Sequence, residues 1–203
     1  MVLILPRQQP KPPVSAPVAV ATVTKPVKIK HDPGPNLIHN GDFEIGVDPG
    51  KFIWLNPGSQ EIDSWQIVDG QIDYVGFAWS AASGERSIDL NGSPGKGSIT
   101  QTINTEPGVH YEVTFYLAGN PMGNKSAADP IKYMRLELRA GNELTGRVFT
   151  FDTSAIDPSK IEWSKKQFSF HATEENTVLI FKSAGESNPW GPLIDNVAVH
   201  RLP

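Results

Sequence analysis

The chain has 203 residues, of which 38% are hydrophobic and 20% are charged, and its formal net charge is −4. That length accommodates one domain with a substantial core, or one domain with a tail. The mildly acidic balance disfavours general nucleic-acid binding, and the absence of cysteine excludes disulfide scaffolds, cysteine-ligated zinc and thiol catalysis.

Residues 1–35 differ in composition from the rest of the chain. They contain eight of the 18 prolines and no aromatic residue, and their five basic residues outnumber the single acid, Asp32, by four. Proline fixes φ and removes backbone donors, so we expect an extended, partly polyproline II arm. Two interpretations are open: a linker between an anchor and the domain, or an arm that docks onto partner chains. The apolar run of residues 1–5 is too short to span a bilayer and lacks the features of a secretory signal.

From residue 36 onward the pattern predicts an all-β domain of residues 36–203. Short runs alternate between apolar and polar residues or are rich in β-branched and aromatic ones, and Gly, Pro, Asn and Asp turns separate them. The predicted strands cover residues 36–45, 62–68, 71–77, 86–90, 98–103, 110–117, 132–139, 147–151, 163–170, 177–182 and 193–200. This spacing favours two packed antiparallel sheets, and we predict a jelly-roll β-sandwich.

Catalytic patterns are missing from the sequence. It has no HExxH zinc motif and no GxSxG nucleophile elbow, and the glycine-rich segment 92–98 lacks the spacing of a phosphate loop. Three of the five histidines fall in strand-like alternating patterns, where outward-facing or hydrogen-bonded side chains are expected: His110, His171 and His200. We therefore predict that the protein is not an enzyme.

Two carboxylate motifs lie near the ends of the predicted domain. Asp42 and Glu44 follow the Asn40-Gly41 turn, and Asp195 stands in an otherwise apolar strand. The first and last strands of a sandwich are often neighbours, so Glu44 and Asp195 would converge there. Hard carboxylate oxygens suit Ca²⁺. The alternative is that both carboxylates cap backbone amides at strand ends.

The order of several motifs resembles a known family. They are residues 36–44 (NLIHNGDFE), Trp65, Tyr74, residues 84–92 (GERSIDLNG), 97–103 (GSITQTI), 111–120 (YEVTFYLAGN), 163–170 and 191–197 (GPLIDNV). This order is similar to that of the DUF642 family and the bacterial choice-of-anchor C proteins, which have galactose-binding-like jelly-roll domains.

The resemblance implies a non-catalytic module of cell-wall or cell-surface proteins, similar to carbohydrate-binding modules. Such modules often carry a structural calcium, with ligands from motifs that match Glu44 and Asp195. Plant members have tandem domains and cysteines, and this chain has neither. The bacterial group typically ends in a sorting anchor, whereas this chain ends at Arg201-Leu-Pro203, so the resemblance supports the fold better than any particular ligand.

Aromatic residues supply a sugar-binding hypothesis, because sugar rings stack on exposed aromatic faces and nearby polar groups bond the hydroxyls. Trp65 and Trp163 begin apolar runs and are expected in the core. Predicted ligand-binding residues are the loop tryptophans and two polar residues: Trp54, Trp79, Trp190, Asn120 and Arg135. The alternatives are that these rings plug the ends of the sandwich or anchor a protein partner.

The sequence therefore predicts a non-catalytic extracytoplasmic module that binds a glycan or cell-wall polysaccharide, with calcium as a structural ion. The alternative is a structural subunit of a larger surface or membrane-associated assembly, in which residues 1–35 dock onto partner chains. No nucleic-acid partner and no transmembrane segment are expected, and membrane association would be peripheral, through partners. Deleting residues 1–35 separates the two hypotheses, because sugar binding would survive the deletion and incorporation into an assembly would not.

Overall fold

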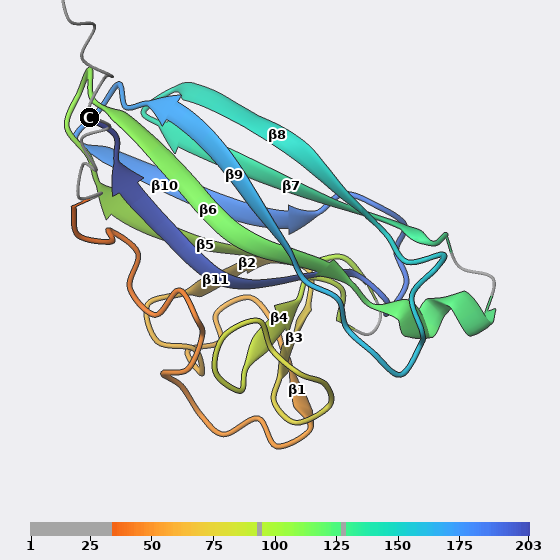
Figure 1. Ribbon diagram of the computed structural model, residues 1–203. Coiled ribbons are helices and arrows are strands. Elements are labelled where there is room, and N and C mark those ends of the chain that lie inside the picture. The colour runs from red at the N-terminus through yellow and green to blue at the C-terminus, as the bar shows by residue number, and fades with distance from the viewer. Residues whose placement is uncertain (1–33, 93–94, 127–128) are drawn as a thin grey trace, which may run out of the picture. The chain divides into compact units, whose positions relative to one another are not determined.

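The computed structural model describes residues 34–92, 95–126 and 129–203, so nearly all of the predicted arm lies outside the described residues. The described chain forms a sandwich of two antiparallel sheets (Figure 1). Its strands are β1 (Phe52–Leu55), β2 (Gln66–Asp69), β3 (Ile72–Val75), β4 (Ser87–Asp89), β5 (Ser98–Asn104), β6 (His110–Gly119), β7 (Ile131–Ala140), β8 (Glu143–Asp152), β9 (Ser164–His171), β10 (Asn176–Ser183) and β11 (Pro192–Arg201). The prediction of an all-β jelly-roll sandwich is confirmed.

Each sheet joins strands that are distant in sequence. One sheet has six strands in the order β1-β3-β4-β11-β6-β9, and the other has five in the order β2-β5-β10-β7-β8. Strand β11 pairs with β4 on one side and with β6 on the other, so the last strand of the chain lies inside the six-stranded sheet. Closing the sandwich therefore requires both halves of the sequence.

Alternation along β6 builds the core between the sheets. Every second side chain is buried: Tyr111, Val113, Phe115 and Leu117. The Phe115 ring lies edge-on to Phe149 of β8 at 5.1 Å and to Phe181 of β10 at 5.3 Å, measured between ring centroids. One side chain of the six-stranded sheet thus contacts two strands of the other sheet, which is how sandwich layers interdigitate.

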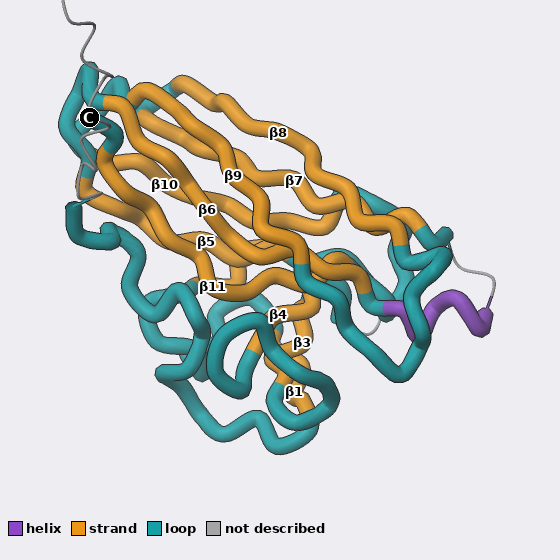
Figure 2. Tube along the Cα trace, in the orientation of Figure 1, coloured by secondary structure: helices purple, strands orange, loops and turns teal. Residues whose placement is uncertain are grey.

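The loops are unevenly distributed. Figure 2 shows long loops gathered around the short strands β1, β3 and β4, whereas β6 to β11 form the long, regular part of the sandwich. The helical structure in the described part is a short 3₁₀ helix, Pro121–Ser126. Nothing helical there is long and apolar enough to cross a membrane.

Two sequence predictions fail near the start of the domain. The segment 36–45 is a series of turns and no strand, because Asn40 (φ 50°) and Phe43 (φ 61°) adopt left-handed backbone conformations that interrupt an extended chain. The predicted strand 71–77 ends at Val75, which leaves Phe77 in a loop. Strand β1 is absent from the predicted set. Its four residues, Phe-Ile-Trp-Leu, are all apolar, so they show no alternation, although Phe52 and Trp54 are exposed in the structure.

Candidate functional site

The turn before β1 is fixed by the side chain of Asn40. Its Nδ2 donates hydrogen bonds to the carbonyl oxygens of Ile45 and Asp63, both at 2.8 Å, and its Oδ1 accepts one from the Ile45 N–H at 2.9 Å. The indole N–H of buried Trp65 donates to the Asn40 carbonyl at 2.8 Å. These bonds set the position of Glu44, which lies within the turn.

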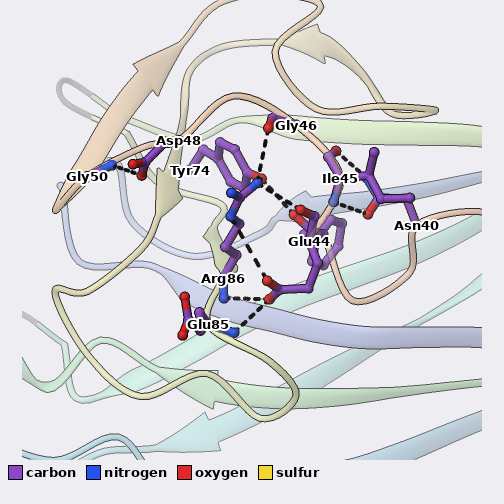
Figure 3. Close-up of polar contacts among 10 residues, drawn as sticks. Asn40, Glu44, Ile45, Gly46, Asp48, Gly50, Tyr74, Glu85 and Arg86 are labelled. Carbon is purple, nitrogen blue, oxygen red and sulfur yellow. Dashed lines mark hydrogen bonds and ion pairs between the residues drawn. The ribbon is translucent and has the colours of Figure 1, made fainter.

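Arg86 ties this turn to strand β3. Its Nη1 donates to the Tyr74 hydroxyl and to the Glu44 carbonyl at 2.8 Å, and to the Gly46 carbonyl at 3.2 Å (Figure 3). The Tyr74 side chain is fully buried, and its hydroxyl donates to the Phe43 carbonyl at 2.6 Å. Burial raises the pKa of Tyr74, which keeps the phenol protonated as the donor in this chain.

Two carboxylates hold the loop between β3 and β4. One oxygen of Asp195 accepts hydrogen bonds from the main-chain N–H groups of residues 82 and 83, at 2.7 and 2.8 Å. One oxygen of Glu44 accepts hydrogen bonds from the main-chain N–H groups of residues 85 and 86, both at 2.7 Å. Because Glu44 and Asp195 belong to opposite ends of the domain, both ends of the chain shape this single loop.

Gly84 lies between the two anchored segments of the loop. Its φ is +64°, and a Cβ atom at this position would come within 2.3 Å of Glu44 Oε1. A larger residue would therefore strain the backbone and displace the carboxylate that holds it.

The loop and the turn at residues 48–50 form the walls of a cleft of about 580 Å³, here called the aromatic cleft, lined by residues 48–50, 76–77, 79–81 and 84–86. The N–H of Phe77 donates to the Gly50 carbonyl at 3.0 Å, which joins the two walls. The Phe77 side chain is 79% exposed, and half-buried Trp79 donates its indole N–H to Ser87 Oγ at 3.2 Å. The cleft thus combines a free aromatic ring, a fixed aromatic ring and charged groups.

The structure separates the other predicted aromatic residues. Trp54 is 58% exposed on β1, with its ring centroid 6.4 Å from that of Phe52. Trp190 is half-buried and packs against Gly123, outside the lining of the aromatic cleft. Trp163 is half-buried, and its indole N–H donates to the Ser80 carbonyl at 3.0 Å, so it supports the cleft wall. The prediction that Trp163 lies in the core is wrong.

The two predicted polar ligands also lie apart from the aromatic cleft. Asn120 is 5% exposed, and its amide donates to Asp89 Oδ2 at 3.0 Å, so it serves a buried polar cluster. Arg135 lies on β7 and donates to Glu137 Oε1 at 2.8 Å; Lys182 of β10 contacts the same oxygen at 2.6 Å. The structure does not bring Asn120 and Arg135 together with Phe77 and Trp79.

Two buried carboxyl groups lie beside each other on neighbouring strands. Asp73 of β3 and Asp89 of β4 are directly opposed in the strand register. Desolvation by burial raises the pKa of Asp73 to about 7 and that of Asp89 to about 8. Asp89 is fully buried, so it has no access to a substrate, and its oxygens accept bonds from Asn120 and from main-chain N–H groups. The pair is suited to a structural role.

The predicted calcium ligands are already bonded to the chain. Asp195 uses both oxygens for main-chain N–H groups, since its second oxygen accepts from Asn196 at 2.6 Å, and Glu44 uses one oxygen in the same way. Asp42 is half-buried. Among the described residues, no three acidic or histidine side chains form a group that would hold a metal ion. As described, the residues fit amide capping better than ion binding, and calcium stays a prediction.

Solved structures with this fold include carbohydrate-binding modules and parts of enzymes. The family 16 carbohydrate-binding module-2 is 19% identical, with a TM-score of 0.50 over 81% of this chain and 99% of that one. The tandem family 22 modules of Paenibacillus barcinonensis Xyn10C are 15% identical, with a TM-score of 0.51 over 83% and 46%. The arabinose-bound arabinofuranosidase MgGH51 is 9% identical, with a TM-score of 0.54 over 82% and 26%. The fold is therefore that of a carbohydrate-binding-module-like sandwich.

The chain belongs to the DUF642 family, described as a protein of unknown function, whose match covers residues 36–200. It is also 30% identical over 171 residues to Halomucin of Haloquadratum walsbyi, a match that covers 81% of this chain and 2% of Halomucin. The chain thus spans a very small part of the length of that relative. The predicted family resemblance is confirmed.

Sequence reasoning missed Phe77 and Arg86 as residues of the cleft. Phe77 falls at the end of an apolar run that reads as a strand, and only the Gly at position 76 hints that the strand has ended. Arg86 resembles an ordinary charged residue at the start of a strand. Its three partners lie 12 to 42 positions away in sequence, so no local pattern identifies it.

Proposed function

We propose that the described domain is a non-catalytic, extracytoplasmic saccharide-binding module and that the saccharide binds in the aromatic cleft. The observation that carries the proposal is the 79% exposed ring of Phe77 beside Trp79 in a cleft held open by the Glu44 and Asp195 contacts. Exposed aromatic faces stack on the C–H faces of sugar rings, while peptide and carboxylate groups bond the hydroxyls.

A second hollow is the other candidate for the saccharide site. It measures about 690 Å³ and is lined by residues 39, 58–60, 62–67 and 100–102. Its aromatic residue, Trp65, is only 2% exposed, so the hollow offers no ring for stacking. Size therefore favours this hollow, but chemistry favours the aromatic cleft.

One further observation argues against catalysis, and another supports a location outside the cytoplasm. The buried carboxyl pair Asp73 and Asp89 is withdrawn from solvent, which argues against glycosidase chemistry at that position. The similarity to Halomucin and to carbohydrate-binding modules favours a surface or secreted protein. Because those relatives are distant or far longer, the ligand of this chain is inferred from its own cleft.

The test is a glycan array followed by calorimetric titration of the best oligosaccharide with the full chain. Replacing Phe77 with Ala should weaken binding about tenfold, since a stacked ring contributes roughly 0.5–1.5 kcal/mol beyond its buried area. Leu144→Ala is the matched control, because Leu144 is an exposed apolar residue on the other sheet. Equal binding by the Phe77→Ala variant and the wild type would contradict the proposed cleft.

The proposal includes calcium as a structural ion. An ion at Glu44, Asp195 and Asp42 would have to displace the N–H bonds to the first two carboxylates or use the remaining Glu44 oxygen. If calcium raises the thermal unfolding midpoint and EDTA reverses the change, the folded protein binds calcium. An unchanged midpoint would leave amide capping as the sole role of these carboxylates.

The alternative function, an assembly subunit docked by residues 1–35, depends on residues outside the described part. It predicts that the native protein co-elutes with other chains and loses them when residues 1–35 are deleted. Saccharide binding that survives the same deletion supports the module proposed above.

A further inference from the structure

Three exposed aromatic rings follow one another at strand β1, and two of them lie outside the lining of the aromatic cleft. Phe77, Phe52 and Trp54, here called the aromatic row, are 79%, 37% and 58% exposed. The ring centroids of Phe52 and Trp54 are 6.4 Å apart. Leu55 is buried in the core and Ile53 packs against it. Because side chains of a strand alternate between its faces, Phe52 and Trp54 share the outer face of the six-stranded sheet.

Strand pairing places this ring pair on the same face as the aromatic cleft. Phe52 is the register partner of Val75 on β3, and Val75 is the partner of Ser87 on β4. Direct partners in a sheet point to the same face, so Phe52 and Ser87 do as well. The indole N–H of Trp79, the fixed ring of the cleft, donates to Ser87 Oγ at 3.2 Å. The cleft and the ring pair therefore lie over one sheet face.

Phe77 connects the cleft with the ring pair. Its N–H donates to the Gly50 carbonyl at 3.0 Å, and its ring carbon Cε1 lies 3.9 Å from the position that a Cβ atom on Gly50 would take. Gly50 precedes Phe52 by two positions, so their Cα atoms are at most about 7 Å apart. A ligand that stacks on Phe77 therefore has Phe52 within reach, and Trp54 lies next along the strand.

Polar groups lie beyond both ends of the aromatic row. At the cleft end are the exposed side chains of Asp48 and Glu85. At the other end, directly after β1, Oδ1 of exposed Asn56 accepts a hydrogen bond of 2.9 Å from Gln71 Nε2. Amide and carboxylate groups bond sugar hydroxyls. An extended chain from Gly50 to Asn56 spans up to about 20 Å, which is longer than a single sugar ring.

The size and shape of the aromatic row favour a sugar chain over a protein partner. An aromatic side chain buries about 150–250 Å² when it is fully covered, and these three are already partly covered. A specific protein interface buries about 800 Å² on each partner, so the row alone is too small for one. Because the row follows a strand, it is straight and suits an extended β-1,4-linked chain better than a curved α-1,4-linked one.

We propose that the saccharide site continues from the aromatic cleft along β1 and takes an extended β-1,4-linked oligosaccharide or polysaccharide. Successive parts of this chain stack on Phe77, Phe52 and Trp54. The extended site rests on the proposed saccharide function and adds to it the class of ligand, a chain of several sugars and not a single terminal sugar. Removing the Trp54 ring would therefore shorten the site without abolishing it.

The test is calorimetric titration of the full chain with cello-, xylo- and β-1,4-galacto-oligosaccharides of two to six sugars. In at least one series, affinity should rise about tenfold from the disaccharide to the hexasaccharide. Trp54→Ala should weaken binding of that hexasaccharide about 3- to 10-fold and of the disaccharide less than about twofold, whereas Phe77→Ala should weaken both. Trp54→Phe should retain most of the hexasaccharide affinity, because an aromatic ring remains.

Leu144→Ala is the matched control, because Leu144 is exposed and apolar but lies on the five-stranded sheet. It should bind the hexasaccharide as the wild type does. Equal thermal midpoints of the variants and the wild type would show that each variant folds.

The outcomes separate the extended site from the proposed cleft. Affinity that does not rise with chain length, or wild-type hexasaccharide binding by Trp54→Ala, would overturn the extended site and leave the cleft in place. Binding on the glycan array without binding to any of the three series would also overturn it. A dimer in size-exclusion chromatography that Trp54→Ala dissociates would do the same, since the row would then join two copies. No saccharide binding at all would overturn both proposals.

Discussion

The loop over residues 76–86 and the outer face of the five-stranded sheet both present side chains to solvent, but they are held in different ways. The loop depends on single side chains, since Asp195 and Glu44 contact it from distant parts of the sequence, and its own Arg86 bonds back to the Glu44 carbonyl. The sheet face depends on continuous strand pairing, with β7 in register with β8 over ten residue pairs. One surface is therefore vulnerable to single substitutions, and the other is not.

Charged groups behave oppositely in the two regions. Beneath and beside the loop, desolvation raises the pKa values of Asp73, Asp89 and Asp195 to about 7, 8 and 7. On the sheet face burial also acts to raise the pKa of Glu137, but bonds from Lys182 and Arg135 outweigh it, and the pKa is lowered. The first region favours neutral carboxyl groups and the second favours a carboxylate.

The largest expected effect concerns Arg86. Arg86→Ala removes the donor to the Tyr74 hydroxyl and to two carbonyls, so we expect a loss of roughly 2–4 kcal/mol in the free energy of unfolding. Urea denaturation measures it. The control is Arg139→Ala, an exposed arginine on the sheet face, which should cost less than about 0.5 kcal/mol. Similar losses of stability in both variants would contradict the greater sensitivity of the loop to single substitutions.

The next effect is a pH dependence caused by the buried acids. The folded protein retains a proton on Asp89 that the unfolded chain releases near pH 4, so this contribution to stability is complete below pH 4 and is lost as the pH rises through about 8. We expect unfolding free energy to fall by about 2–4 kcal/mol over this range, with Asp73 contributing in the same direction.

Asp89→Asn should flatten that profile, because the replaced side chain cannot ionise. Denaturation at several pH values between 4 and 8 measures the slope. Glu137→Gln is the control, since a lowered pKa acts below this window. A profile as steep in the Asp89→Asn variant as in the wild type would exclude Asp89 as the source.

A smaller effect is expected for Glu137 itself. Because the pKa of Glu137 is lowered on folding, its ionised side chain stabilises the folded protein fully above the unfolded-state pKa of 4.5. This stabilisation is lost as the pH falls through the folded-state pKa. Both partners are more than a third exposed, so we expect Glu137→Gln to cost only about 1 kcal/mol at pH 7. In acid denaturation, the difference from the wild type should close as the pH falls below the lowered pKa of Glu137, and a constant difference would contradict a charge effect.

The smallest expected effect sharpens the assignment of the saccharide site. Lys182→Ala alters the sheet face, so saccharide affinity should remain within about twofold of the wild type if the aromatic cleft binds the ligand. Calorimetric titration, with the Phe77→Ala variant alongside, measures both effects. A larger loss for Lys182→Ala than for Phe77→Ala would move the site to the five-stranded sheet.

The sequence was informative where structure follows local pattern. Alternation along residues 111–117 predicted β6 and its buried face, and the ordered motifs predicted the family. The sequence also identified Glu44 and Asp195 as residues that act together, and they do bind one loop, although through backbone amides. Each of these predictions depended on short-range periodicity or on residues with distinctive chemistry.

The aromatic cleft was harder to predict because its walls are defined by long-range contacts. Asp195 and the N–H groups that it accepts are separated by more than 110 positions in sequence. Trp79 was predicted as a binding residue and lines the cleft, whereas Trp190, Asn120 and Arg135 lie elsewhere. Tryptophan in a loop is a local signal, but which loops meet is decided by the sheet order.

The anchoring of the 82–86 loop by Asp195 has a consequence for synthesis on the ribosome. Residues 82 and 83 are synthesised 113 and 112 positions before their anchor Asp195, which becomes available only when β11 has left the exit tunnel. A nascent chain or a truncated fragment that ends before β11 therefore lacks a shaped aromatic cleft, and folding must wait for contacts of high sequence separation. If the aromatic cleft binds the saccharide as proposed, binding can begin only after β11 has joined the sheet.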